Sequence, residues 1–314
     1  MSQVFSATLS AMLTMLICMI VGFLLKKKNI EPEGTDSVFS RFLSFVVAPA
    51  MSFNSFSQNF NLQNIRENYN IVVYGLLIAL IAVTIGTFLS RAFTKDGYVR
   101  GIYKYAIAFA NFGYMGNAVV ISIFGDEMLY YYLLFTTPMN IIVYTWGMTQ
   151  LIPGKKGFKA TLVRITNPST IAVALGIIVG ACNLKGYIPE FLVGAMSSLS
   201  NCMGPISMVL TGYVVGKFDI KKSLTNKKIY IVSFLRLLVF PALYCGLLIL
   251  LGANSTILTV ALIAYAMPLG LNTVVFPAAY GADTSVGASM ALISNALCIA
   301  TFPLMYALLS MILK

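Results

Sequence analysis

The sequence predicts an all-α polytopic membrane protein. Hydrophobic residues make up 59% of its 314 residues and charged residues only 10%, and the mean hydropathy is +0.86. A soluble globular chain carries about 25% charged residues. Apolar stretches of about 20 residues, the length that an α-helix needs to cross a bilayer, recur along the whole chain. Together with an internal repeat, these observations predict ten transmembrane helices arranged as two inverted five-helix repeats.

Short connecting segments separate the predicted spans and leave no room for a soluble domain. The spans cover residues 4–25, 36–56, 70–90, 101–124, 128–151, 168–184, 190–215, 228–251, 255–281 and 285–312. No basic residue precedes the first span, whereas Lys26 to Lys28 follow it. This pattern is typical of a retained signal-anchor whose N-terminus lies outside the cell.

The net charge of +11 is explained by topology. The loops after the odd-numbered spans carry Lys26, Lys27, Lys28, Arg91, Lys95, Arg100, Lys155, Lys156, Lys159, Arg164, Lys217, Lys221, Lys222, Lys227 and Lys228, whereas those after the even-numbered spans carry only Arg66 and Lys185. Basic loops stay in the cytoplasm, so both termini are predicted outside a cell (plasma) membrane. The lipid bilayer is the expected partner of this surface, and the charge does not indicate nucleic acid.

The residue types exclude most catalytic chemistry. The chain has no histidine and only ten acidic residues, and its five cysteines lie in apolar runs without CxxC spacing. The cysteines therefore resemble small core residues rather than disulfides or metal ligands. An aspartyl membrane protease would need a second intramembrane aspartate beside Asp283, which ends the ninth span. We expect no enzyme activity, no cofactor and no metal site.

An internal repeat relates the two halves of the chain, residues 1–151 and 152–314. Three pairs of residues have nearly the same separation: 157 residues for Pro32 and Pro189, 156 for Pro49 and Pro205, and 157 for Asn111 and Pro268. A fourth pair, Pro138 and Pro303, is separated by 165 residues. Five spans per repeat is an odd number, so the second repeat enters the membrane with the opposite orientation. Inverted repeats of this kind are typical of secondary transporters.

The fourth span is interrupted near its middle. Asn111, Gly113, Gly116 and Asn117 fall within seven residues of the otherwise apolar stretch from Ala108 to Glu127. A broken helix leaves backbone groups unpaired at a cost of several kcal/mol each, unless the break lines a polar cavity or is buried in protein. Close helix packing at the glycines is the alternative explanation.

The ninth span contains the matching interruption. Pro268 lacks a backbone N–H, Gly270 permits an irregular turn, and Asn272 and Thr273 add polar groups. A simple proline kink would explain this stretch alone. Because the two interruptions hold the same position in opposed repeats, the sequence predicts crossed, broken helices in spans four and nine. Their free N–H groups and carbonyls would form a substrate site near the midplane.

Several motifs resemble those of the auxin efflux carrier family, within the larger group that includes the bile-acid/sodium symporters. They are ANFGYMGNAVV followed by FGDE, NIIVYTWGM (140–148), TNPSTIAVALG (166–176) and AMPLGLNTVVFP (266–277). The resemblance covers essentially the whole chain and is closer to bacterial members. The long hydrophilic central loop of many plant members is absent, because only residues 152–167 separate spans five and six.

The resemblance implies a scaffold domain and a transport domain, each built from both repeats. Substrate would bind where spans four and nine cross, and the transport domain would move like an elevator. The residues implied for substrate binding are Asn111 and Asn140 from the transport side and Ser52, Asn54 and Ser55 from span two of the scaffold. Ala118 stands where the family has a proline after the "MG" pair. Relatives form homodimers through the scaffold.

The predicted function is secondary transport of a small organic anion. The resemblance implies an auxin-like aromatic carboxylate or a dicarboxylate such as malate or malonate, and the amide-lined crossing favours the aliphatic class. No acidic residue lies well inside a span, so a carboxylate proton relay is not expected. A sodium-coupled symporter and a non-transporting sensor of the same fold remain alternatives.

Arg236 is the most deeply placed basic residue, about two turns from Lys228. An intramembrane arginine near a helix end commonly extends its side chain to the interface, and we expect Arg236 to reach the cytoplasmic side in this way. The alternative is an anion contact, in which Arg236 pairs with a substrate carboxylate or a lipid headgroup.

Overall fold

The computed structural model describes residues 2–30, 32, 34–151, 168–217, 225–279 and 282–313. Within these residues the chain is all-helical, and its one β-bridge is an isolated pair, Ala110 and Leu269. Several helices are long and apolar, as expected for a polytopic membrane protein. The predicted repeat boundary, between residues 151 and 152, borders a segment outside the described residues.

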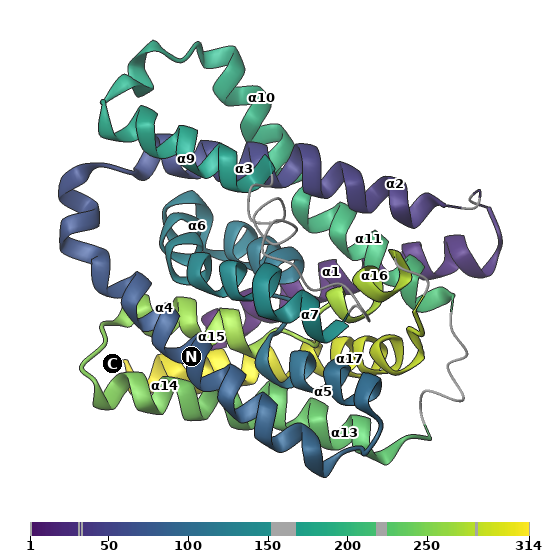
Figure 1. The fold of residues 1–314 in the computed structure, drawn as a ribbon. Helices are drawn as coiled ribbons and strands as arrows, with labels where there is room; N and C mark the ends of the chain where they lie inside the picture. Colours follow the sequence, from purple (N-terminus) through teal and green to yellow (C-terminus); the bar gives the residue numbers. More distant parts are fainter. Residues whose placement is uncertain are drawn as a thin grey trace.

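The first half of the chain forms helices that follow the predicted spans (Figure 1). They are α1 (Ser2–Lys27), α2 (Thr35–Phe42), α3 (Ala48–Asn59), α4 (Leu62–Leu89), α5 (Gly97–Ala108), α6 (Asn117–Ile142) and α7 (Met148–Leu151). π-helical turns at Leu43–Val47, Phe112–Gly116 and Val143–Gly147 connect neighbouring helices, and a 3₁₀ turn follows α4 at Ser90–Ala92.

The second half follows the same plan. Its helices are α9 (Pro168–Ala181), α10 (Glu190–Asn201), α11 (Met203–Gly216), α13 (Lys227–Phe234), α14 (Phe240–Leu250), α15 (Ser255–Ala266), α16 (Asn272–Ala279) and α17 (Ser285–Ile312). A 3₁₀ turn at Leu184–Tyr187 follows α9, and a π-helical turn at Leu235–Val239 joins α13 to α14.

Helical structure lies in all ten predicted ranges, although some boundaries differ. By length and composition, five described helical stretches can cross a membrane, namely Leu9–Lys27, Ile65–Ala92, Phe112–Leu151, Lys227–Leu250 and Ser285–Ile312, and Pro168–Ala181 and Ser255–Ala266 are shorter apolar helices. The helix of the third span begins at Leu62 instead of residue 70, because its polar first turns are helical too. The count of ten spans and the inverted repeat stay predictions.

Gly125 separates the fourth and fifth predicted spans. It has φ 80° and ψ −174° inside the segment Asn117–Ile142, and this backbone conformation is open essentially only to glycine. The chain therefore turns between residues 124 and 128, where the sequence places the loop.

In Figure 1, α2, α3, α9 and α10 form a group along the upper edge, and α13 and α14 lie along the lower edge. Helices α1 and α11 make one of the closest pairings in the molecule, because a Cβ atom on Gly22 would overlap the carbonyl of Val209 and one on Gly212 would overlap that of Met19. In the upper group, Gly176 of α9 packs against Phe53 and Phe56 of α3. Small residues commonly allow such close contact between membrane helices.

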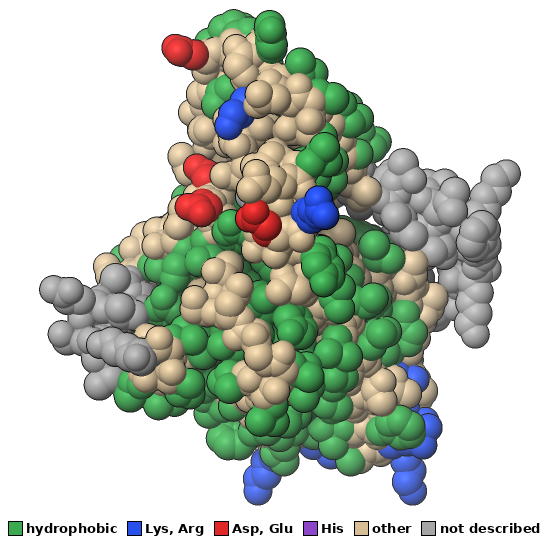
Figure 2. All heavy atoms as spheres, turned by 90° about the vertical axis from the view of Figure 1, so that its left-hand side faces the viewer, with side chains coloured by type: hydrophobic (Ala, Val, Ile, Leu, Met, Phe, Trp, Pro, Cys, Tyr) green, Lys and Arg blue, Asp and Glu red, His purple; other side chains and the backbone are tan. Residues whose placement is uncertain are grey.

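The outer surface of the molecule is strongly apolar. Large hydrophobic side chains exposed on it include Ile17, Phe45, Phe88, Phe191 and Leu250. Figure 2 shows hydrophobic side chains over much of one face, with lysine and arginine side chains at its lower edge and a few acidic and basic side chains in its middle and upper parts. A surface of this kind is stable against lipid rather than water.

Candidate functional site

The two predicted interruptions lie against each other in the structure. Helix α5 ends at Ala108 and α15 at Ala266, and the residues that follow them, Phe109 and Met267, are extended. The backbone N–H of Asn111 donates to the carbonyl of Pro268 at 2.8 Å, next to the antiparallel bridge between Ala110 and Leu269. The two breaks thereby satisfy part of each other's unpaired backbone.

Pro268 and Gly270 explain the break after α15. Proline disfavours helical backbone at the preceding residue, here Met267, and cannot donate the N–H that would continue the helix. A Cβ atom at Gly270 would lie 3.2 Å from the carbonyl oxygen of Ala110, so glycine permits the close approach of the two strands.

The break after α5 has no proline and depends on Asn111. This residue has φ −79° and ψ 50°, and its carbonyl accepts from the N–H groups of Met115 at 3.1 Å and Gly116 at 3.0 Å. A π-helical turn over Phe112–Gly116 then leads into α6.

The two glycines of this turn have different surroundings. A Cβ atom at Gly116 would collide with the hydroxyl of Tyr132, and that hydroxyl donates to the carbonyl of Phe112 at 2.9 Å. Gly116 therefore makes room for Tyr132 and is buried. Gly113 is half-exposed and has open space where a side chain would be.

Helix α17 supplies two further contacts to the second break. The Ser294 hydroxyl accepts from the N–H of Leu269 at 2.9 Å, and the Cys298 thiol donates to the carbonyl of Ala266 at 3.6 Å. Sequence reasoning missed both residues, as it missed Tyr132. A buried serine in the middle of the apolar tenth span was the only available signal.

The amide and hydroxyl side chains of the breaks are mostly paired locally. Asn117 Nδ2 donates to the carbonyl of Gly113 at 2.6 Å, and Thr273 Oγ1 donates to that of Gly270 at 2.9 Å. Asn272 Nδ2 donates to the hydroxyl of Tyr105 on α5 at 2.7 Å, which connects the two broken helices through side chains.

Asn111 is different. Its side chain is 3% exposed, and its Nδ2 group has no hydrogen-bond partner among the described residues. A buried donor without a partner costs about 1–3 kcal/mol. Asn111 is therefore a buried amide with unused hydrogen-bonding capacity directly at the paired breaks.

The residues proposed from span two lie on α3 and are buried. Asn54 Nδ2 donates to the Ser197 hydroxyl of α10 at 3.3 Å, whereas Asn54 Oδ1 and the Ser55 hydroxyl have no partner among the described residues. Span two approaches the breaks elsewhere, because the hydroxyls of Ser44 and Tyr114 lie 3.5 Å apart. Ser52 is also buried, and Asn140 is half-buried on α6.

Aromatic residues surround the breaks. The rings of Tyr105 and Phe109 lie 5.5 Å apart at the end of α5. The rings of Tyr144 and Phe276 lie 6.4 Å apart, and Tyr114, Tyr144 and Asn272 are all half-buried. The sequence interpretation described the crossing as amide-lined and did not include these tyrosines, because they are brought together from different helices.

Arg236 does not reach the interface. Its side chain is 0% exposed, and its guanidinium carbon lies 5.3 Å from the ring centre of Tyr265 on α15. The expectation of an interfacial side chain is wrong, because Arg236, in the π-helical turn Leu235–Val239, is buried against Tyr265 of α15 inside the helix bundle. None of its three guanidinium nitrogens has a hydrogen-bond partner among the described residues.

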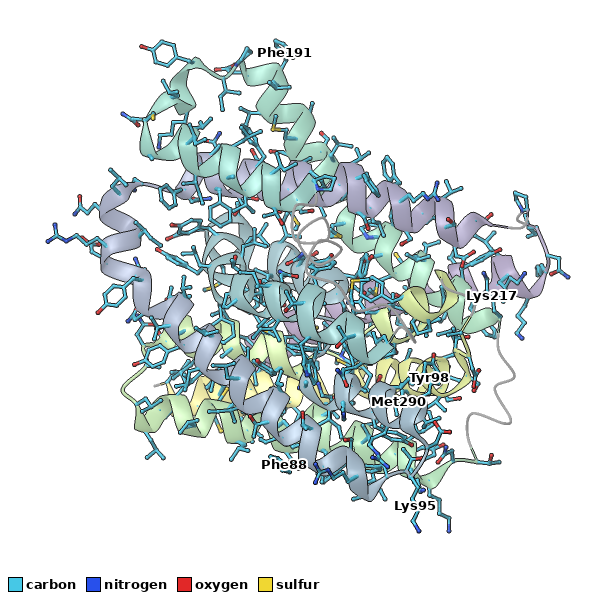
Figure 3. All side chains as sticks on the ribbon, in the orientation of Figure 1. Phe88, Lys95, Tyr98, Phe191, Lys217 and Met290 are labelled. Carbon is cyan, nitrogen blue, oxygen red and sulfur yellow. The ribbon has the colours of Figure 1, made fainter. Side chains whose placement is uncertain are left out.

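The ends of the broken helices are also joined outside the predicted spans. The Tyr98 hydroxyl at the start of α5 donates to the backbone carbonyl of Asp283, before α17, at 2.7 Å. Burial, and secondarily the Asp283 carboxylate, raises the pKa of Tyr98, so the phenol keeps its proton. Figure 3 shows Tyr98 on the same side of the molecule as Lys95 and Lys217 and away from Phe191.

The described residues contain no group of three or more histidine, cysteine, aspartate or glutamate side chains that could hold a metal ion. The polar groups of the breaks are instead backbone N–H groups, carbonyls, amides and hydroxyls. These groups can bind a small ligand through hydrogen bonds and helix-end charge.

An apolar helix bundle with two paired helix breaks in its interior is an architecture of membrane transport proteins. Residues 7–161 and 155–306 match the family model described as membrane transport protein, and the chain belongs to this family, the auxin efflux carrier family. The predicted family is confirmed. Over 303 residues the chain is also 24% identical to an uncharacterized transporter of Methanothermobacter thermautotrophicus, covering 96% of this chain and 98% of that protein.

Proposed function

We propose that this chain is a secondary transporter of a small organic anion that binds beside the paired breaks. The observation that carries the proposal is the Asn111 amide, a buried donor without a partner at the point where the two helices are interrupted. Helical segments restart after the breaks, at Phe112 and at Asn272, and the N-terminal end of a helical segment carries partial positive charge. A carboxylate matches both features.

The proposed substrate is a small carboxylate. The half-buried Tyr114, Tyr144 and Asn272 supply further hydrogen-bonding groups, and the Tyr144 and Phe276 rings supply apolar area. Dicarboxylates such as malate and malonate use the polar groups, whereas an auxin-like aromatic carboxylate also uses the rings. Direct comparison of the two classes decides between them.

The proposed mechanism is an elevator movement of the helices that carry the breaks against the group formed by α2, α3, α9 and α10. The 3.5 Å separation of the Ser44 and Tyr114 hydroxyls supports it, because a long polar contact can separate at little cost. We also propose that the chain forms a homodimer through the scaffold group, α2, α3, α9 and α10, and that it is located in the plasma membrane. The driving force is the membrane potential, worth about 2.3 kcal/mol per charge per 100 mV.

The test is charge movement by purified protein in liposomes adsorbed on a sensor. Steps of malate, malonate and indole-acetate are applied in sodium-free buffer and repeated with sodium. We expect a current without sodium for at least one carboxylate and a strongly reduced current in Asn111→Ala and Asn272→Ala. Normal transport by both variants would refute the site. Binding without current would identify a sensor, and a current only with sodium a symporter.

A further inference from the structure

Arg236 is a buried charge that the proposed substrate site does not use. A guanidinium group stays protonated in proteins, and its burial in a membrane interior is costly without a partner. The face of Tyr265, 5.3 Å away, provides a cation–π contact. That contact leaves the three nitrogens, each without a hydrogen-bond partner among the described residues, unsatisfied.

Within the part of the chain that the structure describes, no carboxylate forms a salt bridge with Arg236. None of the ten acidic residues of the chain lies in residues 228–251 or 255–281, the spans that contain Arg236 and Tyr265. The aromatic side chain that contacts Arg236 is the neutral phenol of Tyr265. The negative charge that stabilises the guanidinium is then expected from the backbone or from outside the chain.

The backbone supplies such a charge at the ends of two helices. Tyr105 lies in the last turn of α5, which ends at Ala108, and Tyr265 lies in the last turn of α15, which ends at Ala266. The C-terminal end of a helix carries roughly half a negative elementary charge. Arg236 packs against the ring of Tyr265 in the last turn of α15, and the end of α5 lies beside the end of α15 at the paired breaks.

In carriers with broken helices, these C-terminal ends and the unwound carbonyls are where a coupling cation binds. We propose that Arg236 is a positioning residue that takes the place of such a cation in this chain. Its permanent charge neutralises the C-terminal ends of α5 and α15, so the helical segments that begin after the breaks bind the substrate anion without sodium. This inference rests on the proposed function, and it says that transport is not coupled to sodium.

The same geometry separates Arg236 from the substrate. Arg236 is 0% exposed and packs on the α15 side of the break, whereas the accessible polar groups, Tyr114 and Asn272, belong to the segments that follow the breaks. Arg236 thus acts on the substrate through the helix ends and not by contact.

The test compares Arg236→Gln and Arg236→Lys with Lys227→Gln, an exposed charge removal at the start of α13. Anion-driven current is measured in choline, sodium and guanidinium buffers. We expect the unchanged protein, Lys227→Gln and Arg236→Lys to give similar currents in all three. The current of Arg236→Gln should fall at least about tenfold in choline, because the variant lacks a unit charge near the helix ends, and should recover when sodium or guanidinium is added.

Thermal unfolding in detergent provides a second measurement that does not require transport. Sodium or guanidinium should raise the Tm of Arg236→Gln and leave that of the unchanged protein constant. A sodium requirement in the unchanged protein, or equal behaviour of Arg236→Gln and the unchanged protein in choline, would overturn this inference while leaving anion transport intact. An unchanged protein that carries none of the anions refutes the proposed function, and the Tm series still decides the role of Arg236.

Discussion

Asn111 combines two tasks at one position. Its backbone pairs with Pro268 across the two breaks, while its side-chain amide is buried without a partner. A side chain that only supported the fold would be expected to have its polar groups satisfied. In the proposed function, this amide is the donor that the substrate carboxylate would satisfy.

Asn111→Ala should reduce anion-driven current at least about tenfold, because the substrate loses a buried hydrogen-bond donor. Its Tm should be unchanged or higher, because the same change removes an unsatisfied group. Both quantities can be measured on one preparation, with Thr14→Ala on the exposed face of α1 as the control. Loss of current together with a lower Tm would instead indicate a structural role for the amide.

Gly116→Ala should destabilise the protein by about 1–3 kcal/mol, the usual cost of overpacking. The added methyl group collides with the Tyr132 hydroxyl and breaks its hydrogen bond to Phe112. Gly113→Ala is the matched control, because nothing lies within 4 Å of its Cβ position. Denaturant unfolding in detergent measures both, and Tyr132→Phe combined with Gly116→Ala should recover part of the loss. Equal stability of the two alanine variants would disprove the packing explanation.

At the scale of helices, the breaks and turns are each produced by a small number of residues. Pro268 ends α15, Asn111 begins the turn after α5, and Gly125 turns the chain between the fourth and fifth predicted spans. The partners that stabilise the breaks come from other helices, as Ser294 of α17 does. Local residues thus create each break, and distant ones make it tolerable in a bundle without water.

Gly125→Ala should cost about 1–3 kcal/mol, because φ 80° with ψ −174° is a conformation open essentially only to glycine. Gly246→Ala in the middle of α14 is the control. It has open space at the Cβ position and should be neutral or stabilising, since alanine favours helix by about 1 kcal/mol. The two free energies of unfolding are compared in one detergent. An unchanged free energy of unfolding in Gly125→Ala would show that the protein does not need the glycine-only backbone conformation at this turn.

At the scale of the whole molecule, the helices sort into a group around α3, α9 and α10 and a larger group that holds the breaks (Figure 1). Glycines permit the closest contact of α1 with α11. The basic side chains of Lys95 and Lys217 lie on one side of the molecule in Figure 3. This arrangement accommodates the predicted orientation, with that side in the cytoplasm.

Cys182, which is exposed just after α9, tests this orientation. In a variant whose other four cysteines are serine, an impermeant maleimide should label Cys182 in intact cells. A second reporter, Lys95→Cys in a background without other cysteines, should be labelled only after permeabilisation. The reverse pattern would show that the positive-inside assignment is inverted.

The sequence alone determined the class of protein, the family and the positions of the two helix breaks. These predictions use local signals, namely hydropathy, the basic loops, Pro268, Gly270 and Asn111. Such signals act on a membrane helix whatever its neighbours are. Helical structure lies in the predicted ranges for the same reason, although the count of ten spans stays a prediction and polar turns such as the start of α4 at Leu62 are not registered by hydropathy.

Only the tertiary structure decided which groups face the breaks. Tyr105 and Asn272 are 167 residues apart in the chain, and Leu269 and Ser294 come from different helices. The burial of Arg236 against Tyr265 likewise depends on how α15 packs, and sequence position favoured the opposite outcome. Which groups are paired and which, like the Asn111 amide and the Arg236 guanidinium, are not depends on packing between distant segments, because a buried polar group in a membrane protein depends on the residues around it for partners.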